Sequence, residues 1–309
     1  MRNEHFARDY PSLARLYHRQ FELTPQYAKG LTARVDNSTP DHLAMTEQLA
    51  GWVITLAGEN LDTVQRDYDW ICQMVLREEI YFRRNNSYRL KTFQQALDEV
   101  YSNDEYMEHY MNGLLISQIW WANHTESFRF YRDKHLGGFT APFDHLEIGP
   151  GHGLLLFLAA QQPHCRSLEA WDISQASANQ TRHALDLLGL KKPVNLRIQD
   201  LFEAHSRQER YDSIVLSEVL EHLETPREAL EIIRSLLKPD GRLLVNVPIN
   251  SPASDHLFLL RSPEEAVEFI ENCGYRIEQT QFEPQTGMTL ERARRMQATI
   301  TTLVIASPR

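Results

Sequence analysis

The chain of 309 residues has little of several features that would place it in a specialised protein class. Its three cysteines, Cys72, Cys165 and Cys273, lie far apart and form no pairing or ligand motif. This odd number and wide spacing argue against a disulfide framework and against a zinc site, and they suit a reducing compartment. We therefore expect a cytoplasmic protein without a metal centre.

Basic residues are also in the minority, because 32 Lys and Arg stand against 42 Asp and Glu and give a formal net charge of −10. Binding to nucleic acid needs clustered Lys and Arg at the phosphates, so we expect no nucleic-acid partner. No apolar run reaches the length of a transmembrane helix, and the N-terminus has no apolar signal core. We therefore expect no membrane partner either.

The most informative feature that is present is the segment 146–153, where Gly149, Gly151 and Gly153 alternate with other residues. Without side chains, these positions let the backbone turn sharply and approach a ligand closely. The apolar run 143–148 before them predicts a buried strand, and the run 154–160 after them predicts a buried helix. A strand, a glycine turn and a helix form the first half of a nucleotide-binding βαβ unit.

The common phosphate-binding fingerprints do not fit this turn. A G-x-G-x-x-G motif that began at Gly149 would need glycine at position 154, which is leucine, and no Gly-Lys-Ser/Thr triplet follows. Glu147, two positions before G-x-G-x-G, instead resembles the acidic residue in the first motif of class I S-adenosylmethionine (AdoMet) methyltransferases. The resemblance implies that the glycine turn receives the methionine part of AdoMet, and that Glu147 helps to orient this part.

The second half of the unit follows in the order of the same family. A short strand at 167–171 ends at Asp172, whose carboxylate can accept two hydrogen bonds from a ribose diol. In the family, an Asp just past the third strand meets the adenine amino group, and Asp200 matches this position. We therefore expect Asp172 and Asp200, with their neighbours Ile173 and Leu201, to bind the nucleoside.

Two further tracts carry the resemblance. A fourth strand is expected at 211–217, and the tract SEVLEHL, which begins at Ser217, resembles the segment after strand four in ubiquinone-type methyltransferases. The tract LKPDG before an expected fifth strand at 242–248 is also typical of the family. The resemblance adds Ser217 and Glu218 to the expected cofactor-binding residues.

The order of these elements predicts a fold and a division of the chain. The alternation of strands and helices predicts a doubly wound α/β fold, and the resemblance implies a seven-stranded Rossmann-like sheet, whose last strand pair, 275–281 and 298–306, is antiparallel. Residues 1–136 show almost no strand signal and several helical stretches. The sequence thus predicts a helical lid, substrate or dimerisation region at 1–138 and an AdoMet-binding domain at 139–309. The helical region could also form the surface of a homodimer.

One long helix is expected from about residue 103 to residue 135. Aromatic, hydroxyl and histidine side chains recur along it at spacings of three and four, so they share one face. This face indicates either a cover over the cofactor and the acceptor pocket or an amphipathic helix packed on the α/β domain. The first interpretation makes Tyr106, Tyr110 and Trp120 substrate-binding candidates and His124 a catalytic candidate.

Methyl transfer is an in-line displacement in which the protein mainly aligns the atoms and excludes water. A base is needed only for a protonated acceptor, and histidine suits this role near neutral pH. Our catalytic candidates are His256 and His222, followed by His124. A proline-punctuated loop after strand five adds Asn250 and Asp255 as substrate-binding candidates, because ligands bind outside the carboxyl ends of strands.

We predict AdoMet-dependent methyl transfer to an oxygen, nitrogen or carbon atom of a small-molecule acceptor in specialised metabolism. A metal-assisted mechanism is not expected, because the stretch 217–219 shows no convincing cluster of acidic ligands. Two alternatives remain open. One is a non-catalytic AdoMet-binding or scaffolding protein, and the other is a nicotinamide-dependent oxidoreductase, against which Leu154 and Asp200 count.

Overall fold

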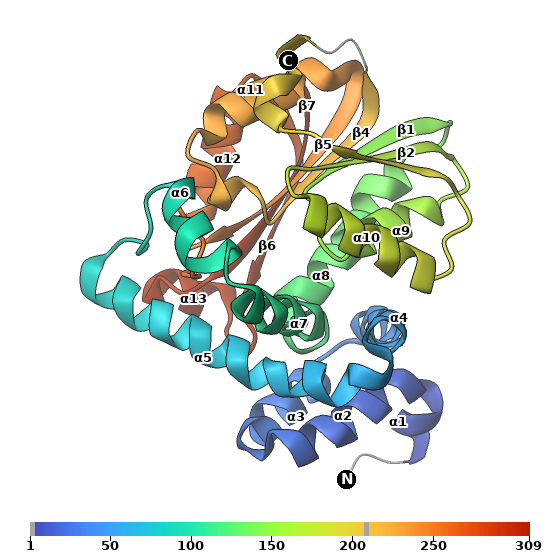
Figure 1. The fold of residues 1–309 in the computed structure, drawn as a ribbon, viewed down its shortest axis with the longest axis vertical. Helices are drawn as coiled ribbons and strands as arrows, with labels where there is room; N and C mark the ends of the chain where they lie inside the picture. Colours follow the sequence, from blue (N-terminus) through green and yellow to red (C-terminus); the bar gives the residue numbers. More distant parts are fainter. Residues whose placement is uncertain (1–3, 207–209) are drawn as a thin grey trace.

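The computed structural model describes residues 4–206 and 210–309 of the chain. Its C-terminal part holds a seven-stranded sheet in the order β3-β2-β1-β4-β5-β7-β6. Its N-terminal part is helical and lies against one end of the sheet (Figure 1). The strands are β1 (Phe143–Ile148), β2 (Cys165–Asp172), β3 (Val194–Ile198), β4 (Tyr211–Ser217), β5 (Leu237–Ile249), β6 (Tyr275–Pro284) and β7 (Ile300–Pro308).

The pairing of these strands confirms the predicted doubly wound sheet. β1 lies between β2 and β4 and is parallel to both, while β3 and β5 extend the parallel part on either side. β7 inserts antiparallel between β5 and β6, as the sequence predicts for the last strand pair. The central strands are buried on both faces, which explains why they read as nearly continuous apolar runs.

Short helices connect the strands and cover the sheet. Two of these helices begin at a serine cap, since Ser174 Oγ accepts a hydrogen bond from the amide of Ser177, and Ser262 Oγ accepts one from the amide of Glu265. The helices of this part are α9 (Leu154–Ala160), α10 (Gln175–Leu187), α11 (Pro226–Leu236), α12 (Pro263–Asn272) and α13 (Leu290–Met296).

The N-terminal part is a set of α-helices with short 3₁₀ and π segments between them. The α-helices are α1 (Glu4–Asp9), α2 (Pro11–Leu23), α3 (Ala28–Asp36), α4 (Pro40–Ala57), α5 (Leu61–Asn85), α6 (Phe93–Ala96), α7 (Asp104–Trp120) and α8 (Ala122–Phe130). π segments occupy Leu97–Tyr101 and Tyr131–His135. The 3₁₀ turns of this part are Pro25–Tyr27, Gly58–Asn60 and Leu136–Gly138. Two further 3₁₀ turns, Leu201–Ser206 and Leu220–His222, follow β3 and β4 in the C-terminal part.

The single helix expected at 103–135 is wrong, because the structure has two helices that meet at Trp121. This residue has extended backbone angles, φ −95° and ψ 112°. The following amide, of Ala122, donates to Thr286 Oγ1 at 2.7 Å, and the carbonyl of Gln118 accepts from Thr125 Oγ1 at 2.7 Å. Side-chain hydroxyls therefore satisfy backbone groups that the helix leaves open at the break.

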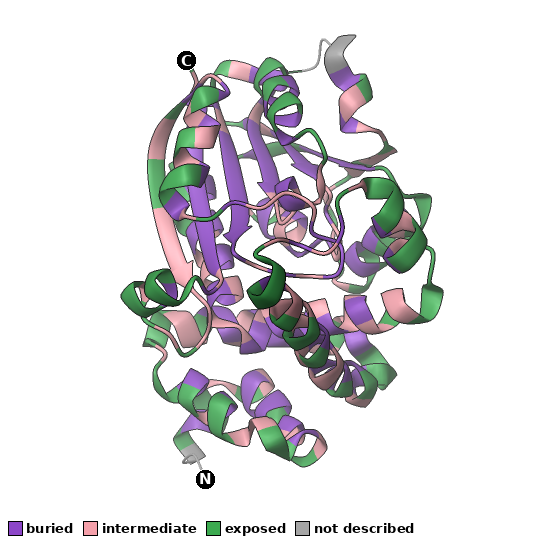
Figure 2. Cartoon of the chain, turned by 90° about the vertical axis from the view of Figure 1, so that its left-hand side faces the viewer, coloured by how far each residue is buried: buried purple, intermediate pink, exposed green. Residues whose placement is uncertain are grey.

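The helices and the sheet share a continuous hydrophobic core. One cluster of buried side chains runs from Leu16 of α2 through Ile116 of α7 to Leu244 of β5 and Leu303 of β7. A second cluster fills the space between the sheet and helices α11 and α12. Figure 2 shows buried strands through the middle of the sheet and mixed burial along the N-terminal helices. The division of the chain at residue 138 stays a prediction.

Within the part of the chain that the structure describes, no helix is long and apolar enough to cross a membrane.

Candidate active site

The glycine turn after β1 depends on backbone angles that favour glycine. Gly149, Gly151 and Gly153 have φ values of 67°, 51° and 69°, all in the left-handed region. The amide of Gly149 donates to the carbonyl of Trp171 at 2.9 Å, and Thr181 Oγ1 of α10 donates to the carbonyl of Gly151 at 2.7 Å. These bonds attach the turn to β2 and α10, so its shape is set by both of its neighbours.

The glycines of the turn differ in what surrounds them. A Cβ atom at Gly149 would lie 2.8 Å from Val219 Cγ2, and one at Gly153 would lie 3.1 Å from Thr181 Cγ2. A Cβ atom at Gly151 would meet no atom within 4 Å. Packing as well as conformation thus favours glycine at position 149, the contacts at Gly153 are tight, and Gly151 faces open space.

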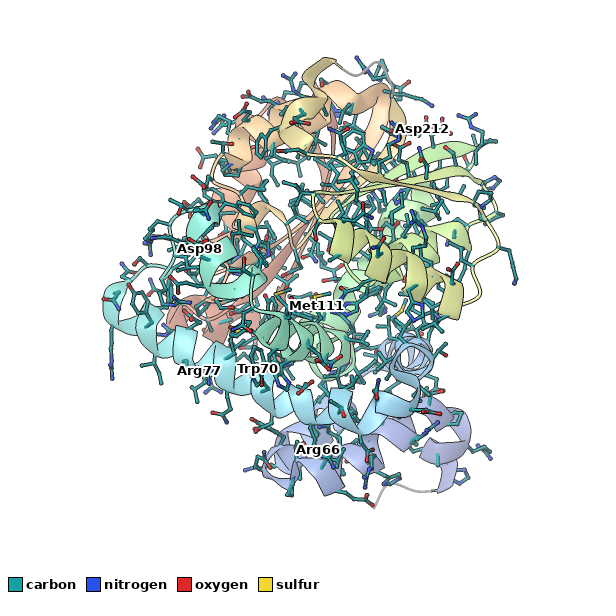
Figure 3. All side chains as sticks on the ribbon, viewed as in Figure 1. Arg66, Trp70, Arg77, Asp98, Met111 and Asp212 are labelled. Carbon is teal, nitrogen blue, oxygen red and sulfur yellow. The ribbon has the colours of Figure 1, made fainter. Side chains whose placement is uncertain are left out.

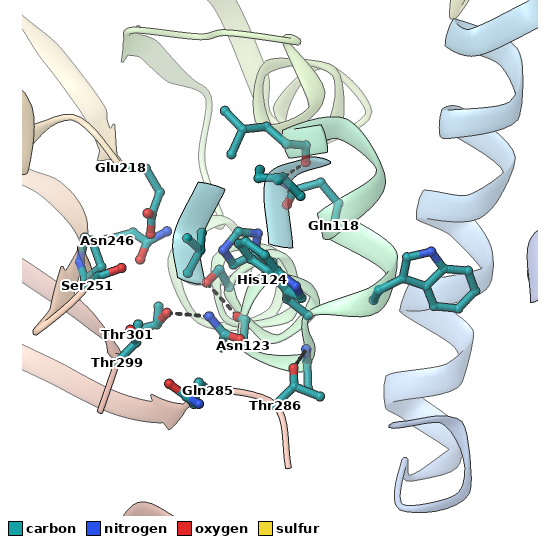
Figure 4. Close-up of a pocket in the computed structure, with 18 of the residues that line it drawn as sticks. Gln118, Asn123, His124, Glu218, Asn246, Ser251, Gln285, Thr286, Thr299 and Thr301 are labelled. Atoms are coloured by element: carbon teal, nitrogen blue, oxygen red, sulfur yellow. Dashed lines mark hydrogen bonds between the residues drawn. The ribbon is translucent and has the colours of Figure 1, made fainter. Parts of the chain in front are cut away.

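That open space is a cavity of about 900 Å³ between the glycine turn and the N-terminal helices. Its size lies at the upper end of the usual range for small-molecule sites, roughly 300–1,000 Å³. Figure 4 shows Glu218, Asn246 and Ser251 on one side of the pocket and His124 and Asn123 of α8 on the other. The two halves of the chain therefore both contribute to its walls.

Helix α7 is attached directly to the glycine turn. The imidazole of His152 hydrogen-bonds to the backbone of Met111, and both residues line the cavity. Burial lowers the pKa of His152 to about 4, so this ring is neutral near pH 7. Met111 lies on the side of α7 that faces the sheet (Figure 3). The contact makes α7 a wall of the cavity beside the expected cofactor site.

Glu147 ends β1 beneath the turn and fits a cationic ligand. Its side chain is buried, and its Oε2 has no hydrogen-bond partner among the described residues. Burial raises the pKa of Glu147 to about 8. On β5, Asn246 Oδ1 is likewise without a partner, while its Nδ2 donates to Ser217 Oγ at 2.9 Å. AdoMet carries an ammonium and a sulfonium. The ammonium of its amino-acid part could donate a hydrogen bond to Glu147 Oε2, and the positive charge would stabilise the ionised form of this buried carboxyl group.

The residues predicted to bind the nucleoside lie beside the turn but outside the lining of the cavity. Asp172 is buried at the end of β2, where its carboxylate accepts hydrogen bonds from the Ser174 amide at 2.8 Å and from Ser177 Oγ at 2.5 Å. Asp200 Oδ1 accepts from the Phe202 amide at 2.9 Å. Both carboxylates thus already hold local turns, and their ribose and adenine roles stay predictions.

Their neighbours differ in exposure. Ile173 is 59% exposed, whereas Leu201 is buried against the core on one face of the sheet. An exposed isoleucine next to Asp172 offers an apolar surface of the kind that a base can cover. The structure does not test this role.

The structure brings several candidate residues from distant segments into one cluster. His222 follows β4, while Asp255 and His256 lie in the loop after β5, and the two histidine rings are 4.9 Å apart at 86°. Asp255 accepts hydrogen bonds from the hydroxyls of Tyr110 and Tyr101, each at 3.0 Å. Of the predicted substrate-binding residues, Tyr110 and Asp255 therefore act together, with each other and with Tyr101.

Glu221 is the central residue of this cluster and was not among the predicted site residues. It is fully buried in the 3₁₀ turn after β4, and its Oε1 lies 3.8 Å from His222 Nε2 and 4.0 Å from His256 Nε2. Burial raises the pKa of Glu221 well above its usual value, and the neighbouring Glu218 raises it further. The spacing of two glutamates three residues apart, directly before a histidine, is the signal that could have identified it.

The charge states of the cluster follow from burial. Burial, together with the neighbouring His222, lowers the pKa of His256 to about 4, so its ring is neutral near pH 7. Burial raises the pKa of Glu218 to about 7. Glu218 also has a left-handed φ of 52°, which is uncommon for a residue with a side chain and is found preferentially at functional sites.

The candidates from the broken helix are placed differently from one another. His124 lines the cavity from α8, is buried with a pKa lowered to about 4, and its Nδ1 lies 3.0 Å from Ser117 Oγ. Trp120 is fully buried and donates from Nε1 to Gln20 Oε1 at 3.1 Å. Tyr106 packs on Trp70 outside the cavity lining.

Asn250 was a substrate-binding candidate but lies outside the cavity lining, whereas Arg34 was not a candidate and lines the cavity. Asn250 is buried outside the cavity lining, and its Nδ2 donates to the carbonyl of Arg261 at 3.0 Å. Arg34 lines the cavity from α3, was not predicted, and bonds only to uncharged groups, including the hydroxyls of Thr46 and Thr125. Burial lowers the pKa of Arg34 to about 10, although the nearby Glu126 opposes this shift without bonding to the guanidinium.

Part of the chain matches a known protein family, and its fold is similar to that of solved structures. Residues 146–243 match the family model of a methyltransferase domain. No curated protein matches the chain. The fold is similar to that of the mitomycin 7-O-methyltransferase MmcR, with a TM-score of 0.53 and 18% identity over 81% of this chain and 72% of that one.

Two other solved structures are similar at lower scores. The N-methyltransferase NodS from Bradyrhizobium japonicum WM9, in complex with S-adenosyl-L-homocysteine, has a TM-score of 0.49 and 17% identity over 70% of this chain and 98% of that one. The [4+2]-cyclase SpnF has a TM-score of 0.49 and 14% identity over 60% and 80%. The matched segment shows a methyltransferase domain at residues 146–243, which runs from β1 to the first half of β5.

Proposed function

We propose that the protein transfers the methyl group of AdoMet to an oxygen, nitrogen or carbon atom of a small molecule of specialised metabolism. The observation that carries this proposal is the cavity of about 900 Å³, which the glycine turn and the N-terminal helices enclose together. A cavity of this size has room for an acceptor beside the methionine part of the cofactor. The helical region acts as the wall that selects the acceptor.

On the cofactor side, Glu147 and the glycine turn hold the amino-acid part of AdoMet, and Asp172 and Asp200 hold the nucleoside. The unpartnered Glu147 Oε2 and the open space at Gly151 support this assignment. When bound, AdoMet supplies a methyl group on a positively charged sulfur. The protein then needs only to align the acceptor with that group and to exclude water.

On the acceptor side, His256 and His222 accept the proton of a hydroxyl or ammonium acceptor. Both rings line the cavity, and the ring of His256 is neutral near pH 7 and therefore able to take up a proton. His124 lies in the opposite wall and is the weaker candidate, because the Ser117 hydroxyl already faces its Nδ1. Oxygen and nitrogen acceptors suit this arrangement better than carbon acceptors.

Two measurements test the proposal. Calorimetry with AdoMet should show one binding site, and incubation with methyl-labelled AdoMet and fractionated small metabolites should yield a labelled product. Binding without any labelled product would support the non-catalytic AdoMet-binding protein instead. Stabilisation by NAD(H) but not by AdoMet would support the oxidoreductase, since a ligand at a hundredfold its Kd raises the free energy of unfolding by about 2.7 kcal/mol.

A further inference from the structure

We propose that Glu221, His222 and His256 form a binding site for a divalent transition-metal ion at the wall of the cavity. The ion would bind an oxygen of the acceptor, so this second part of the inference rests on the proposed function. The three side chains come from the turn after β4 and the loop after β5, at the carboxyl ends of neighbouring strands. Each offers one ligand atom, and these atoms lie within 4.8 Å of one another.

The distances within the cluster suit a shared cation better than direct contact. Glu221 Oε1 lies 3.8 Å from His222 Nε2 and 4.0 Å from His256 Nε2, which is too far for hydrogen bonds. Ligand atoms on one tetrahedral ion at metal–ligand distances of about 2.1 Å lie about 3.4 Å apart. The side chains would therefore have to move closer together by about half an ångström for the two pairs with Glu221, and by at most about 1.4 Å for any pair, to bind one ion.

The orientation of both imidazoles leaves the correct nitrogen free. His256 Nδ1 lies 2.6 Å from the carbonyl oxygen of Ser251, and His222 Nδ1 lies 3.2 Å from the carbonyl oxygen of Asp255. A carbonyl oxygen only accepts, so each Nδ1 carries a proton, and in the neutral form of each ring Nε2 presents a lone pair. Two lone pairs and a carboxylate oxygen thus converge without a donor between them, as they do around a bound metal ion.

Glu221 provides an independent observation that a ligand is missing. Its side chain is fully buried, neither carboxylate oxygen has a donor partner by hydrogen-bond geometry among the described residues, and the side chain that interacts with it most strongly is another carboxyl group, that of Glu218. A buried carboxyl group without a donor is costly, and a cation bound at Oε1 would remove this cost. The alternative is a proton on Glu221, and the experiment below separates the two.

Asp255 supports the site without being a ligand. Its two oxygens accept from the hydroxyls of Tyr101 and Tyr110, and Oδ2 lies 3.5 Å from His222 Nδ1. A carboxylate on the far nitrogen of a ligating histidine fixes the ring and raises its basicity. Asp255 is therefore a positioning residue for His222.

The donor set indicates the kind of metal. Two imidazoles and one carboxylate suit Fe²⁺, Co²⁺, Ni²⁺ or Zn²⁺ and, less strongly, Mn²⁺, whereas Mg²⁺ and Ca²⁺ prefer sets of oxygen ligands. All three residues line the cavity, so the remaining coordination positions face the acceptor. The inference therefore specifies a hydroxyl acceptor: with the ion bound, the two histidines are its ligands, and only without the ion do they take the proton-accepting role proposed above.

The reaction that this site would serve balances without another reagent. The acceptor O–H bond breaks and its proton passes to solvent, because a divalent cation lowers the pKa of an oxygen that binds it. The electron pair on that oxygen forms the new bond to the methyl carbon. The carbon–sulfur bond breaks, and its electrons stay on sulfur in neutral S-adenosylhomocysteine.

The test is a titration of the chelator-treated, dialysed full-length chain with Co²⁺, followed by visible absorption and by calorimetry. We expect one equivalent to bind and to give the absorption of a site with nitrogen and oxygen ligands, and Mg²⁺ at the same concentration not to compete. E221Q and H256A should each weaken Co²⁺ binding at least a hundredfold, and D255N should weaken it roughly ten- to a hundredfold. H183A, which removes an exposed histidine of α10, is the matched control and should bind as the wild type does.

Two results would overturn the inference. One is the absence of saturable Co²⁺ binding to the wild-type chain, a measurement that does not depend on the folding of any variant. The other is unchanged Co²⁺ affinity in E221Q or H256A variants whose circular dichroism shows a folded chain. AdoMet calorimetry on the same samples separates the proposals, because AdoMet binding without Co²⁺ binding removes the metal site alone. Co²⁺ binding without methyl transfer would instead remove the proposed function.

Discussion

The sharpest test of the cofactor site is to place a methyl group at each of two glycines of the same turn. In G151A, the added Cβ meets no atom within 4 Å, so the variant loses stability only through its left-handed φ of 51°. This conformation costs a residue with a side chain about 1–2 kcal/mol. In G149A, the same cost applies, and the Cβ also lies 2.8 Å from Val219 Cγ2. Overpacking of this kind adds about 1–3 kcal/mol.

The two variants should therefore separate stability from binding. We expect G149A to lower the free energy of unfolding by about 2–5 kcal/mol in total, and G151A by about 1–2 kcal/mol. G151A should nevertheless lose at least tenfold in AdoMet affinity, because its new methyl group occupies the space where the backbone approaches the methionine part. Urea unfolding measures the first quantity, and calorimetry with AdoMet measures the second.

A third glycine provides the matched control. Gly189, just after α10, has a φ of 74° and open space around its Cβ position, but it does not line the cavity. G189A should lose about as much stability as G151A and bind AdoMet as the wild type does. If G151A and G189A bind AdoMet equally well, the turn does not hold the cofactor. If G149A is as stable as G151A, the contact with Val219 does not matter.

Further predictions concern three buried ionisable groups, those of Asp172, Glu147 and Arg34. D172A should weaken AdoMet binding by one to two orders of magnitude, from a lost bidentate contact of roughly 1.5–3 kcal/mol, and the chain should stay folded; unchanged binding by calorimetry would refute the ribose assignment. The pKa of Glu147 is about 8 in the folded chain against 4.5 in the unfolded chain, so the folded state keeps a proton that the unfolded state releases. The free energy of unfolding should therefore fall between pH 4.5 and pH 8 more steeply in the wild type than in E147Q, by at most about 5 kcal/mol, and parallel urea-unfolding curves would contradict this. R34M should raise the free energy of unfolding by about 1–4 kcal/mol, because it removes a buried cation without a carboxylate partner. R129M, which breaks an ion pair with Glu126 at 2.7 Å, should not raise the free energy of unfolding. If thermal unfolding shifts in the same direction in R34M and R129M, the buried charge of Arg34 has no special effect on stability.

The sequence by itself determined the features that depend on neighbouring residues. The alternating glycines after an apolar run predicted a strand, a turn and a helix, and the structure has these elements at 143–148 and 154–160. The cap of α10 by Ser174 is a feature of the same local kind, because it involves residues only three positions apart. The parallel part of the sheet also follows from the alternation of strands and helices along the chain, since crossover connections leave few topologies. The antiparallel last pair is expected only from the resemblance to the methyltransferase family.

The tertiary structure alone decided the features that join distant segments. The helix at 103–135 breaks at Trp121 because the next amide finds Thr286, a partner 164 residues away that helical periodicity does not reveal. Asp255 meets Tyr110 across 145 positions. Glu221 looks like one more acidic residue in a turn until the loop after β5 brings His256 to it. Local sequence patterns indicate which backbone conformation has a low free energy. Which side chains meet in a buried cluster depends instead on how the elements pack.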